Sequence, residues 1–166
     1  MTVNPVVAVG DSYGGGKVAY IFQVGDPGYI AGQTHGLIAA TADLNGGVEI
    51  AWSNITDTLV GTTGTALGTG QANTTAIVGQ SGCTSGAAYL CDHLTEGSYS
   101  DWYLPSKDEL NQLYLNRVVI GGFDDYYYWS SSEFSASNAW AQFFATGEQL
   151  NGIKDNPSLV RAVRAF

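Results

Sequence analysis

Positively charged residues are scarce in this sequence. Only 6 Lys and Arg stand against 15 Asp and Glu, which gives a formal net charge of −9. Proteins bind nucleic acids largely through Lys and Arg contacts to phosphates, so this composition argues against a nucleic-acid partner. The same shortage of cations disfavours a purely electrostatic attachment to sulfated glycans or to anionic membranes.

Long apolar runs are also missing. No stretch approaches the roughly 18–20 residues that are needed to span a bilayer, so we expect no membrane insertion. The opening residues 1–5 lack the basic and apolar regions of a signal peptide. A protein that acts outside a cell would then use another export route, be a fragment of a longer chain or belong to a phage particle, and the sequence leaves these alternatives open.

Residue types that often carry catalysis or bind metals are few. His35 and His93 have no second ligand at metal-binding spacing, which favours structural or surface roles for both. Cys91 falls on the apolar face of a predicted helix, as a buried thiol does. Cys83 precedes that helix, and a disulfide to Cys91 would need Cα atoms about 4.4–6.8 Å apart. The sequence is compatible both with a disulfide between Cys83 and Cys91 and with two free thiols.

Motifs for known chemistries are absent as well. The three serines at 130–132 lie in no G-x-S-x-G turn and have no assigned base. The glycines at 14–16 lack the spacing of a phosphate-binding loop and are expected to form a turn. We therefore expect no catalytic site and no cofactor.

What the sequence does contain is typical of one β-rich domain. Its 166 residues are 45% apolar, enough to bury a core. Only 13% are charged, and 22 Gly and 10 Tyr give a composition more like exported β-rich proteins than helical cytosolic enzymes. We expect a single domain over residues 10–166, preceded by residues 1–9 as a tether or first strand.

Local patterns predict the order of the elements. Ser106 and Glu109 form a capping box, and Leu110, Leu113 and Tyr114 line one face of the helix that follows. Two further helices are predicted at 71–78 and 85–94, and a long surface loop at 54–70. Strands are predicted at 17–24, 35–40, 48–52, 126–133, 139–145 and 159–166.

The C-terminal segment, residues 126–166, is expected to hold a display surface. Along its strand at 139–145, Trp140 and Phe144 share one face with Gln142, while Ala141 and Phe143 share the other. We expect Trp140 and Phe144 to point inward and Phe143 to point outward. A strand buried on both faces is the alternative.

The composition of this segment suits recognition. Tyr, Ser and Asn supply rigid contact area and adaptable hydrogen bonds at low entropic cost, as they do in antibody loops. Ordinary hairpin and turn residues would look the same, so that reading stays open. The expected ligand-binding residues are Tyr127, Phe134, Ser135, Ser137, Asn138, Ala141, Phe143, Glu148, Gln149, Asn151, Asp155 and Asn156.

Other residues of the segment are expected to be scaffold. In so acidic a chain, Arg161 and Arg164 are expected to pair with carboxylates such as Glu109 or Asp101 and to fix the C-terminal strand. The full scaffold set is Trp129, Ser130, Ser131, Ser132, Trp140, Arg161 and Arg164.

Several sequence blocks occur in the order found in one bacterial and phage family. They include GGGKVAYIF at 14–22, HGLIAA at 35–40, GTGQANTTAIV at 68–78, DWYLPSKDEL at 101–110, YWSSSE at 128–133 and VRAVRAF at 160–166. Through these blocks the chain resembles the Lcl C-terminal domain family from about residue 10 to residue 166. Members of this family occur, among other places, at the ends of collagen-like adhesins.

The resemblance implies a C-type-lectin-like fold, an α+β arrangement of two main helices packed on a small twisted antiparallel sheet with long loops. It also implies an adhesion or receptor-binding module at a cell or virion surface, in some members a homotrimer, that contacts a host glycan or protein. Similar domains are variable proteins of diversity-generating retroelements, in which a C-terminal segment changes ligand specificity. Residues 126–157 lie where such a surface would be.

The resemblance also brings alternatives. The chain would otherwise be a structural capping or trimerising domain at the end of a fibre, or, third, an enzyme of the formylglycine-generating type, which depends on a pair of cysteines. Lectins of this broad fold often use calcium, and Asp124 and Asp125, or Asp155 and Asn156, offer oxygen ligands. The Glu-Pro-Asn type of sugar-binding triplet is absent.

Overall fold

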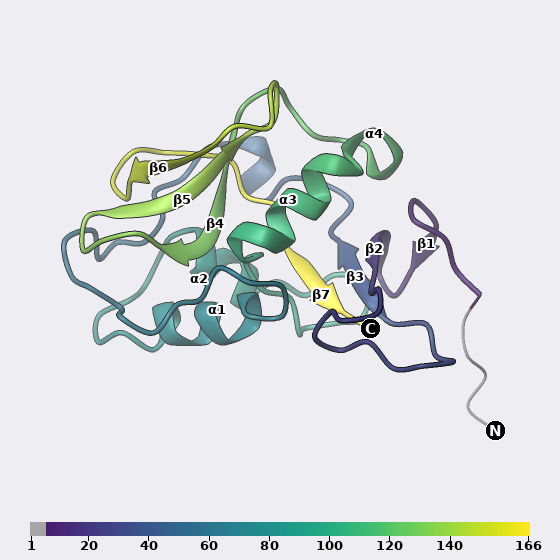
Figure 1. Ribbon diagram of the computed structural model, residues 1–166. Coiled ribbons are helices and arrows are strands. Elements are labelled where there is room, and N and C mark those ends of the chain that lie inside the picture. Colours follow the sequence, from purple (N-terminus) through teal and green to yellow (C-terminus); the bar gives the residue numbers. More distant parts are fainter. Residues whose placement is uncertain (1–5) are drawn as a thin grey trace.

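A capped helix lies at the centre of the protein, as the sequence predicts. The computed structural model describes residues 6–166 (Figure 1). Helix α3 (Lys107–Leu115) starts after Ser106, whose Oγ accepts from the Glu109 amide while the Glu109 carboxylate accepts from the Ser106 amide. Glu109 also accepts from the amide of Gly68, which ties the preceding loop to the start of the helix. The remaining helices are α1 (Gly70–Val78), α2 (Ala87–Asp92) and α4 (Arg117–Ile120), with a 3-10 turn, η1, at Asn45–Gly47.

Short strands form two antiparallel sheets in the described part of the chain. The first sheet has the order β1-β2-β3-β7 and the second the order β4-β5-β6. In the first sheet Ile38 stands opposite Arg164, so the C-terminal strand closes onto the N-terminal part of the chain. The strands are β1 (Ser12–Tyr13), β2 (Gly16–Ile21), β3 (Gly36–Ala39), β4 (Tyr127–Glu133), β5 (Asn138–Phe143), β6 (Gln149–Ile153) and β7 (Val163–Ala165).

Helix α3 lies between the two sheets and contacts β2, β4 and β5 (Figure 1). Helices α1 and α2 pack against each other and against β4. One part of the core contains Trp52 and Trp129, and the other contains Leu113, Tyr128 and Phe144. The predicted α+β class is confirmed, but the prediction of a single sheet with two main helices is wrong, because residues 6–166 form two small sheets and four α-helices.

One predicted strand is absent, and two elements of the structure were not predicted. The strand expected at 48–52 is replaced by one isolated bridge between Ile50 and Ser158. Trp52 in this stretch is fully buried and donates from Nε1 to the carbonyl oxygen of Ser130, so its apolar character reflects core packing. Strand β6 was not predicted, because Asn151 and Gly152 are weak strand formers that only the pairing with β5 holds extended. Helix α4 was not predicted either.

Of the expected tether or first strand at residues 1–9, residues 1–5 lie outside the described residues. Residues 6–9 form no strand.

Two ion pairs, one of them buried, hold the C-terminal residues. Arg164 donates from Nε to Asp101 Oδ1 at 2.6 Å, one of the two partners that the sequence suggested. Arg161 instead pairs with Asp43, with its guanidinium 2.7 Å from the carboxylate. The other suggested partner, Glu109, is engaged by backbone amides at the start of α3. The C-terminal strand is therefore tied to two distant parts of the chain.

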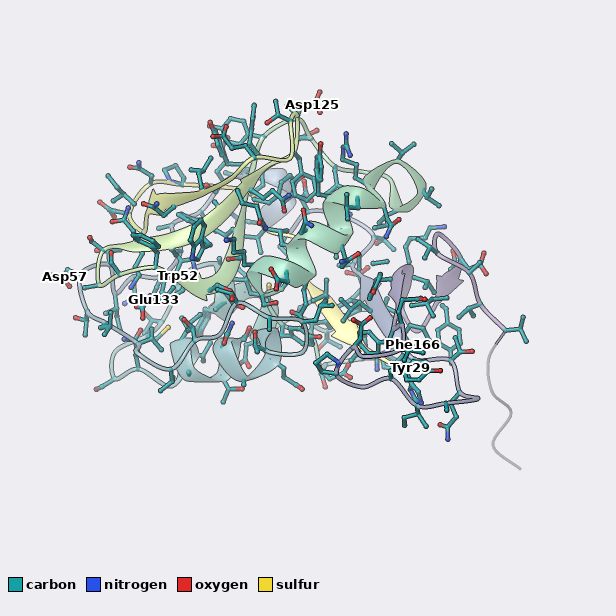
Figure 2. All side chains as sticks on the ribbon, in the orientation of Figure 1. Tyr29, Trp52, Asp57, Asp125, Glu133 and Phe166 are labelled. Atoms are coloured by element: carbon teal, nitrogen blue, oxygen red, sulfur yellow. The ribbon has the colours of Figure 1, made fainter. Side chains whose placement is uncertain are left out.

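A second buried pair, between Lys154 and Glu133, holds the long loop that precedes α1. Lys154 is fully buried, and its Nζ lies 2.6 Å from Glu133 Oε1 and 4.6 Å from the centre of the Trp52 ring. The Glu133 carboxylate also accepts from the amides of Val60 and Gly61. Figure 2 labels Trp52 and Glu133 on the side of the molecule where this loop runs.

Both cysteines are free thiols, so the disulfide alternative is not realised. Cys91 is fully buried on α2, as the apolar face of the predicted helix indicates. Burial raises the pKa of the Cys91 thiol well above its usual range, which keeps it protonated and unreactive.

Candidate functional site

The second sheet presents two different faces, because side chains alternate along each strand. One face carries Tyr127, Trp129 and Ala141, and we call it the pocket face; Trp129 stands directly opposite Ala141. The other face looks toward α3, where Gln142 donates from Nε2 to Asn111 Oδ1 at 2.8 Å. We call it the helix face.

A pocket with a volume of about 360 Å³ lies on the pocket face. This volume falls within the range of small-ligand sites. All three strands and the turn after β6 contribute to it, so its shape depends on the whole sheet. We call it the tyrosine pocket, and its lining residues are Tyr126, Tyr127, Trp129, Ala141, Leu150, Gly152, Asn156, Pro157 and Ser158.

The floor of the tyrosine pocket is preformed. The indole of Trp129 is only 1% exposed and donates from Nε1 to the Ile50 carbonyl oxygen at 2.9 Å. A Cβ atom at Gly152 would come within 3.1 Å of this ring, so glycine allows the backbone to lie on the indole. Ala141 adds a second small side chain. Small residues above a fixed indole thus leave the space open.

Aromatic rings form one wall. The rings of Tyr126 and Tyr127 have centroids 5.6 Å apart and planes at 78°, so they meet as a corner. Tyr127 is supported from the next strand by Phe143, which stacks on it at 4.6 Å. Within residues 6–166, the two tyrosine hydroxyls and the Asn156 side-chain amide form no hydrogen bond. These polar groups are available to a ligand.

The helix face carries Trp140, which was expected to point inward. Trp140 is instead partly exposed, with Lys107 Nζ 3.6 Å above its ring and the Phe134 ring packed edge-on at 5.3 Å. Phe144 is fully buried, as predicted. Trp140 shares the helix face with buried Gln142, but its ring is covered only in part, by Lys107 and Phe134, so the prediction that it is buried is wrong.

The structure divides the predicted ligand-binding residues between the two faces. Tyr127, Ala141 and Asn156 line the tyrosine pocket, and Phe143 supports its wall. Ala141 was predicted to face outward, and this part of its prediction is wrong. Only 4% of its surface is exposed, because the pocket walls and Trp129 surround its small side chain.

Four other predicted residues lie away from the pocket, around the helix face. Asn138 donates from Nδ2 to Asn151 Oδ1 at 3.2 Å, and Gln149 donates from Nε2 to the Lys107 carbonyl oxygen at 3.0 Å. Phe134 is 55% exposed. These side chains cannot act on a ligand bound in the tyrosine pocket.

The last four predicted residues lie in turns. Ser135 Oγ accepts from the Asn138 amide and so shapes the turn between β4 and β5, whereas Ser137 Oγ donates only to the partly exposed side chain of its neighbour Asn138. Glu148 is exposed between β5 and β6, and Asp155 is exposed in the turn after β6. Asp155 directly precedes the pocket residue Asn156.

Sequence reasoning missed part of the pocket. Trp129 was assigned to the scaffold alone, although it shares a strand face with Tyr127 at a spacing of two. Leu150 and Gly152 had no assigned face because β6 was not predicted. The remaining missed residues are Tyr126, Pro157 and Ser158.

The serines at 130–132 have structural partners. Ser130 Oγ donates to the Trp140 carbonyl oxygen at 2.7 Å, and Ser132 Oγ donates to the Gly64 carbonyl oxygen at 2.8 Å. Ser131 Oγ accepts from Asn73 Nδ2 at 3.1 Å. These hydroxyls hold β4 to its neighbours.

No group of three or more His, Cys, Asp or Glu side chains comes together within residues 6–166 in a way that would hold a metal ion. Asp124 and Asp125 lie before β4, and Asp155 lies after β6, all three exposed. Calcium binding therefore stays a prediction from the resemblance.

Across residues 6–166, no helix has the length and apolar character that crossing a membrane requires. The fold and the site define a small α+β domain whose C-terminal sheet carries an aromatic pocket. A model of the Lcl C-terminal domain family matches residues 44–164, which is more than half of the chain. The chain belongs to this family, as the sequence blocks indicated. No curated protein matches it.

Proposed function

We propose that this chain is a non-enzymatic ligand-binding domain of an adhesin or receptor-binding protein. It contacts a host glycan or protein through its C-terminal sheet. The observation that carries the proposal is the tyrosine pocket, whose rim presents Tyr126, Tyr127 and Asn156 with side-chain polar groups free of internal hydrogen bonds. A preformed pocket of this kind binds at low entropic cost, because few side chains need to be ordered.

The scaffold beneath the pocket supports a recognition role. The buried pairs of Arg161 with Asp43 and Lys154 with Glu133 hold the chain on both sides of the turn that carries Asn156. A binding site on elements fixed in this way keeps its geometry when its rim residues change. This property suits the C-type-lectin-like fold and the variable C-terminal surface that the family resemblance implies, and it fits a place at a cell surface or on a virion.

The candidate nucleophiles support a non-enzymatic role. The serine hydroxyls at 130–132 are engaged with backbone and amide groups, and the Cys91 thiol is buried. Cys83 lies near Ser53, with Sγ and Oγ 4.0 Å apart, and forms no pair with Cys91. An active-site cysteine pair of the formylglycine-generating type is therefore disfavoured.

A glycan array combined with a host-protein pull-down tests the proposal. The variant Gly152→Leu fills the tyrosine pocket and is expected to abolish binding to any ligand detected. A second variant, Tyr126→Ala with Asn156→Ala, removes rim groups without adding volume and is expected to weaken binding at least about tenfold, as loss of central contact residues commonly does. Thermal unfolding measured in parallel shows that the variants remain folded.

The helix face provides a matched control. The double variant Phe134→Ala and Asn138→Ala changes exposed or partly exposed residues of the same sheet but none that lines the pocket. It is expected to bind like the parent. If this variant loses binding while the pocket variants keep it, the site lies on the helix face and the pocket assignment is wrong.

A further inference from the structure

The positive charges of the chain are held away from the tyrosine pocket. None of the six Lys and Arg lines it. Five of them lie over aromatic rings elsewhere in the protein, with the charged group about 4–5 Å or less from the ring centre, as cation–π contacts require. These contacts are Lys107 over Trp140, Arg117 over Tyr114, Lys154 over Trp52, Arg161 over Phe123 and Arg164 over Tyr99.

The pocket rings have no such internal cation. Neither Tyr126 nor Tyr127 lies under a Lys or Arg of the described chain. Their perpendicular planes form the corner of the pocket wall. Two aromatic rings set at an angle offer a cation a negative ring face and a second ring beside it.

Two carboxylates are next in sequence to residues that line the pocket. Asp125 directly precedes Tyr126, and Asp155 directly precedes Asn156. Both are exposed, and neither forms an ion pair within residues 6–166. Figure 2 shows Asp125 at one tip of the molecule. With a net charge of −9 and no basic lining residue, the pocket attracts cations and repels anions.

We propose that the tyrosine pocket binds the guanidinium or ammonium group of an Arg or Lys side chain presented by a partner protein. This inference rests on the proposed ligand-binding function and specifies its ligand. The cation lies against the Tyr126 and Tyr127 rings, while Asp125 and Asp155 add long-range attraction from the rim. The Asn156 side-chain oxygen accepts a hydrogen bond from the bound group. Ligands that carry sulfate, phosphate or carboxylate groups are disfavoured.

A titration followed by NMR of the 15N-labelled chain tests the inference with defined probes. Acetyl-arginine methylamide is compared with acetyl-citrulline methylamide, which has nearly the same shape but no charge. The arginine probe is expected to shift the backbone amide signals of Tyr127, Gly152 and Asn156. It should bind about tenfold more tightly than the citrulline probe, as one cation–π contact with a neighbouring carboxylate allows.

Charge variants distinguish a local effect of Asp125 and Asp155 from the effect of the net negative charge of the protein. Replacing both Asp125→Asn and Asp155→Asn is expected to weaken arginine binding about fivefold and to reduce its dependence on salt. The double variant Asp57→Asn and Asp92→Asn makes the same change in net charge at two exposed sites outside the pocket lining and serves as the control. Equal weakening by the control variant would show that only net charge matters and would overturn the rim assignment.

Methyl glycosides of neutral hexoses complete the comparison. If they shift the pocket signals while the arginine probe does not, or if arginine and citrulline bind equally, the cation inference is wrong and the pocket remains a ligand site. If no probe shifts the pocket signals and the array and pull-down also show no binding, the proposed function itself fails.

Discussion

At the scale of the residue, two of the few positively charged side chains form buried ion pairs that join distant parts of the chain. Lys154 and Arg161 are fully buried, and each is paired with a carboxylate. Burying a charge is costly unless a partner compensates it, so these pairs make the surrounding loops depend on one another. Glu133 shows this most clearly, because it joins Lys154 to the backbone of the loop at Val60 and Gly61.

The charge of Glu133 makes stability depend on pH. Burial by itself would raise the pKa of Glu133, but hydrogen bonds from the Gly61 amide, Lys154 and the Val60 amide outweigh it and lower that pKa. A carboxyl group with a lowered pKa in the folded state stabilises the protein above its unfolded pKa, about 4.3, and loses this contribution as the pH falls through the folded value.

Glu133→Gln tests this linkage. At pH 7 the variant is expected to lose about 3 kcal/mol of unfolding free energy, because Lys154 keeps its charge in a buried site without a counter-ion. The difference from the parent should shrink below about pH 4, where the parent carboxylate becomes protonated. Urea unfolding across this pH range measures both effects. A difference that stays constant down to pH 3 would contradict the role of ionised Glu133.

At the scale of the element, local signals are strong only where a helix is capped. The capping box of α3 satisfies backbone groups at the helix start from within four consecutive residues. Strand β6 has no comparable local signal and is held by backbone pairing with β5, from Asn138 opposite Ile153 to Gln142 opposite Gln149. The pocket therefore depends on an element whose conformation comes from its neighbour.

Ser106→Ala is expected to lower the unfolding free energy by about 1–2 kcal/mol. The variant loses the acceptor for the Glu109 amide and also the hydroxyl that donates to the Ala66 carbonyl oxygen at 2.9 Å. Thermal and urea unfolding measure the change. Ser137→Ala, in the exposed turn between β4 and β5, is the control and should unfold like the parent. A loss no larger than in this control would show that the cap adds little stability.

At the scale of the whole molecule, a strand from the first quarter of the chain pairs with the C-terminal strand. The family model starts at residue 44, yet β3 lies before this point and pairs with β7 near the C-terminus. Asp43, the ion-pair partner of Arg161, also lies before it. The folded unit is therefore larger than the part that the family model matches.

A chain that begins at residue 44 is expected not to fold. It would lose the pairing partner of β7, the buried side chains of Leu37 and Ile38, and the counter-ion of Arg161. Loss of the counter-ion alone costs about 3–5 kcal/mol, a large share of the stability of a typical domain. A chain that begins at residue 6 keeps these contacts and is the control. Circular dichroism and NMR dispersion distinguish the two, and a well-folded shorter chain would contradict this account.

The sequence by itself determined the elements that carry their own signals. These are the capped helix α3, the helix around Cys91, the strand near 127–133 and the family membership. Each of the three elements rests on residues close together in the chain, and the family membership rests on short blocks in a fixed order. The expectation that Arg161 and Arg164 pair with carboxylates also held, with Asp101 as the partner of Arg164, because 15 Asp and Glu surround only 6 Lys and Arg.

Only the tertiary structure decided which surface forms a pocket. Trp140 and Ala141 are neighbours on one strand, and their environments depend on Lys107 from α3 and on Trp129 and Gly152 from the adjacent strands. Alternation along β5 places these two side chains on opposite faces but does not tell which face is covered. That choice depends on long-range packing energies, which bring distant residues together around the tyrosine pocket.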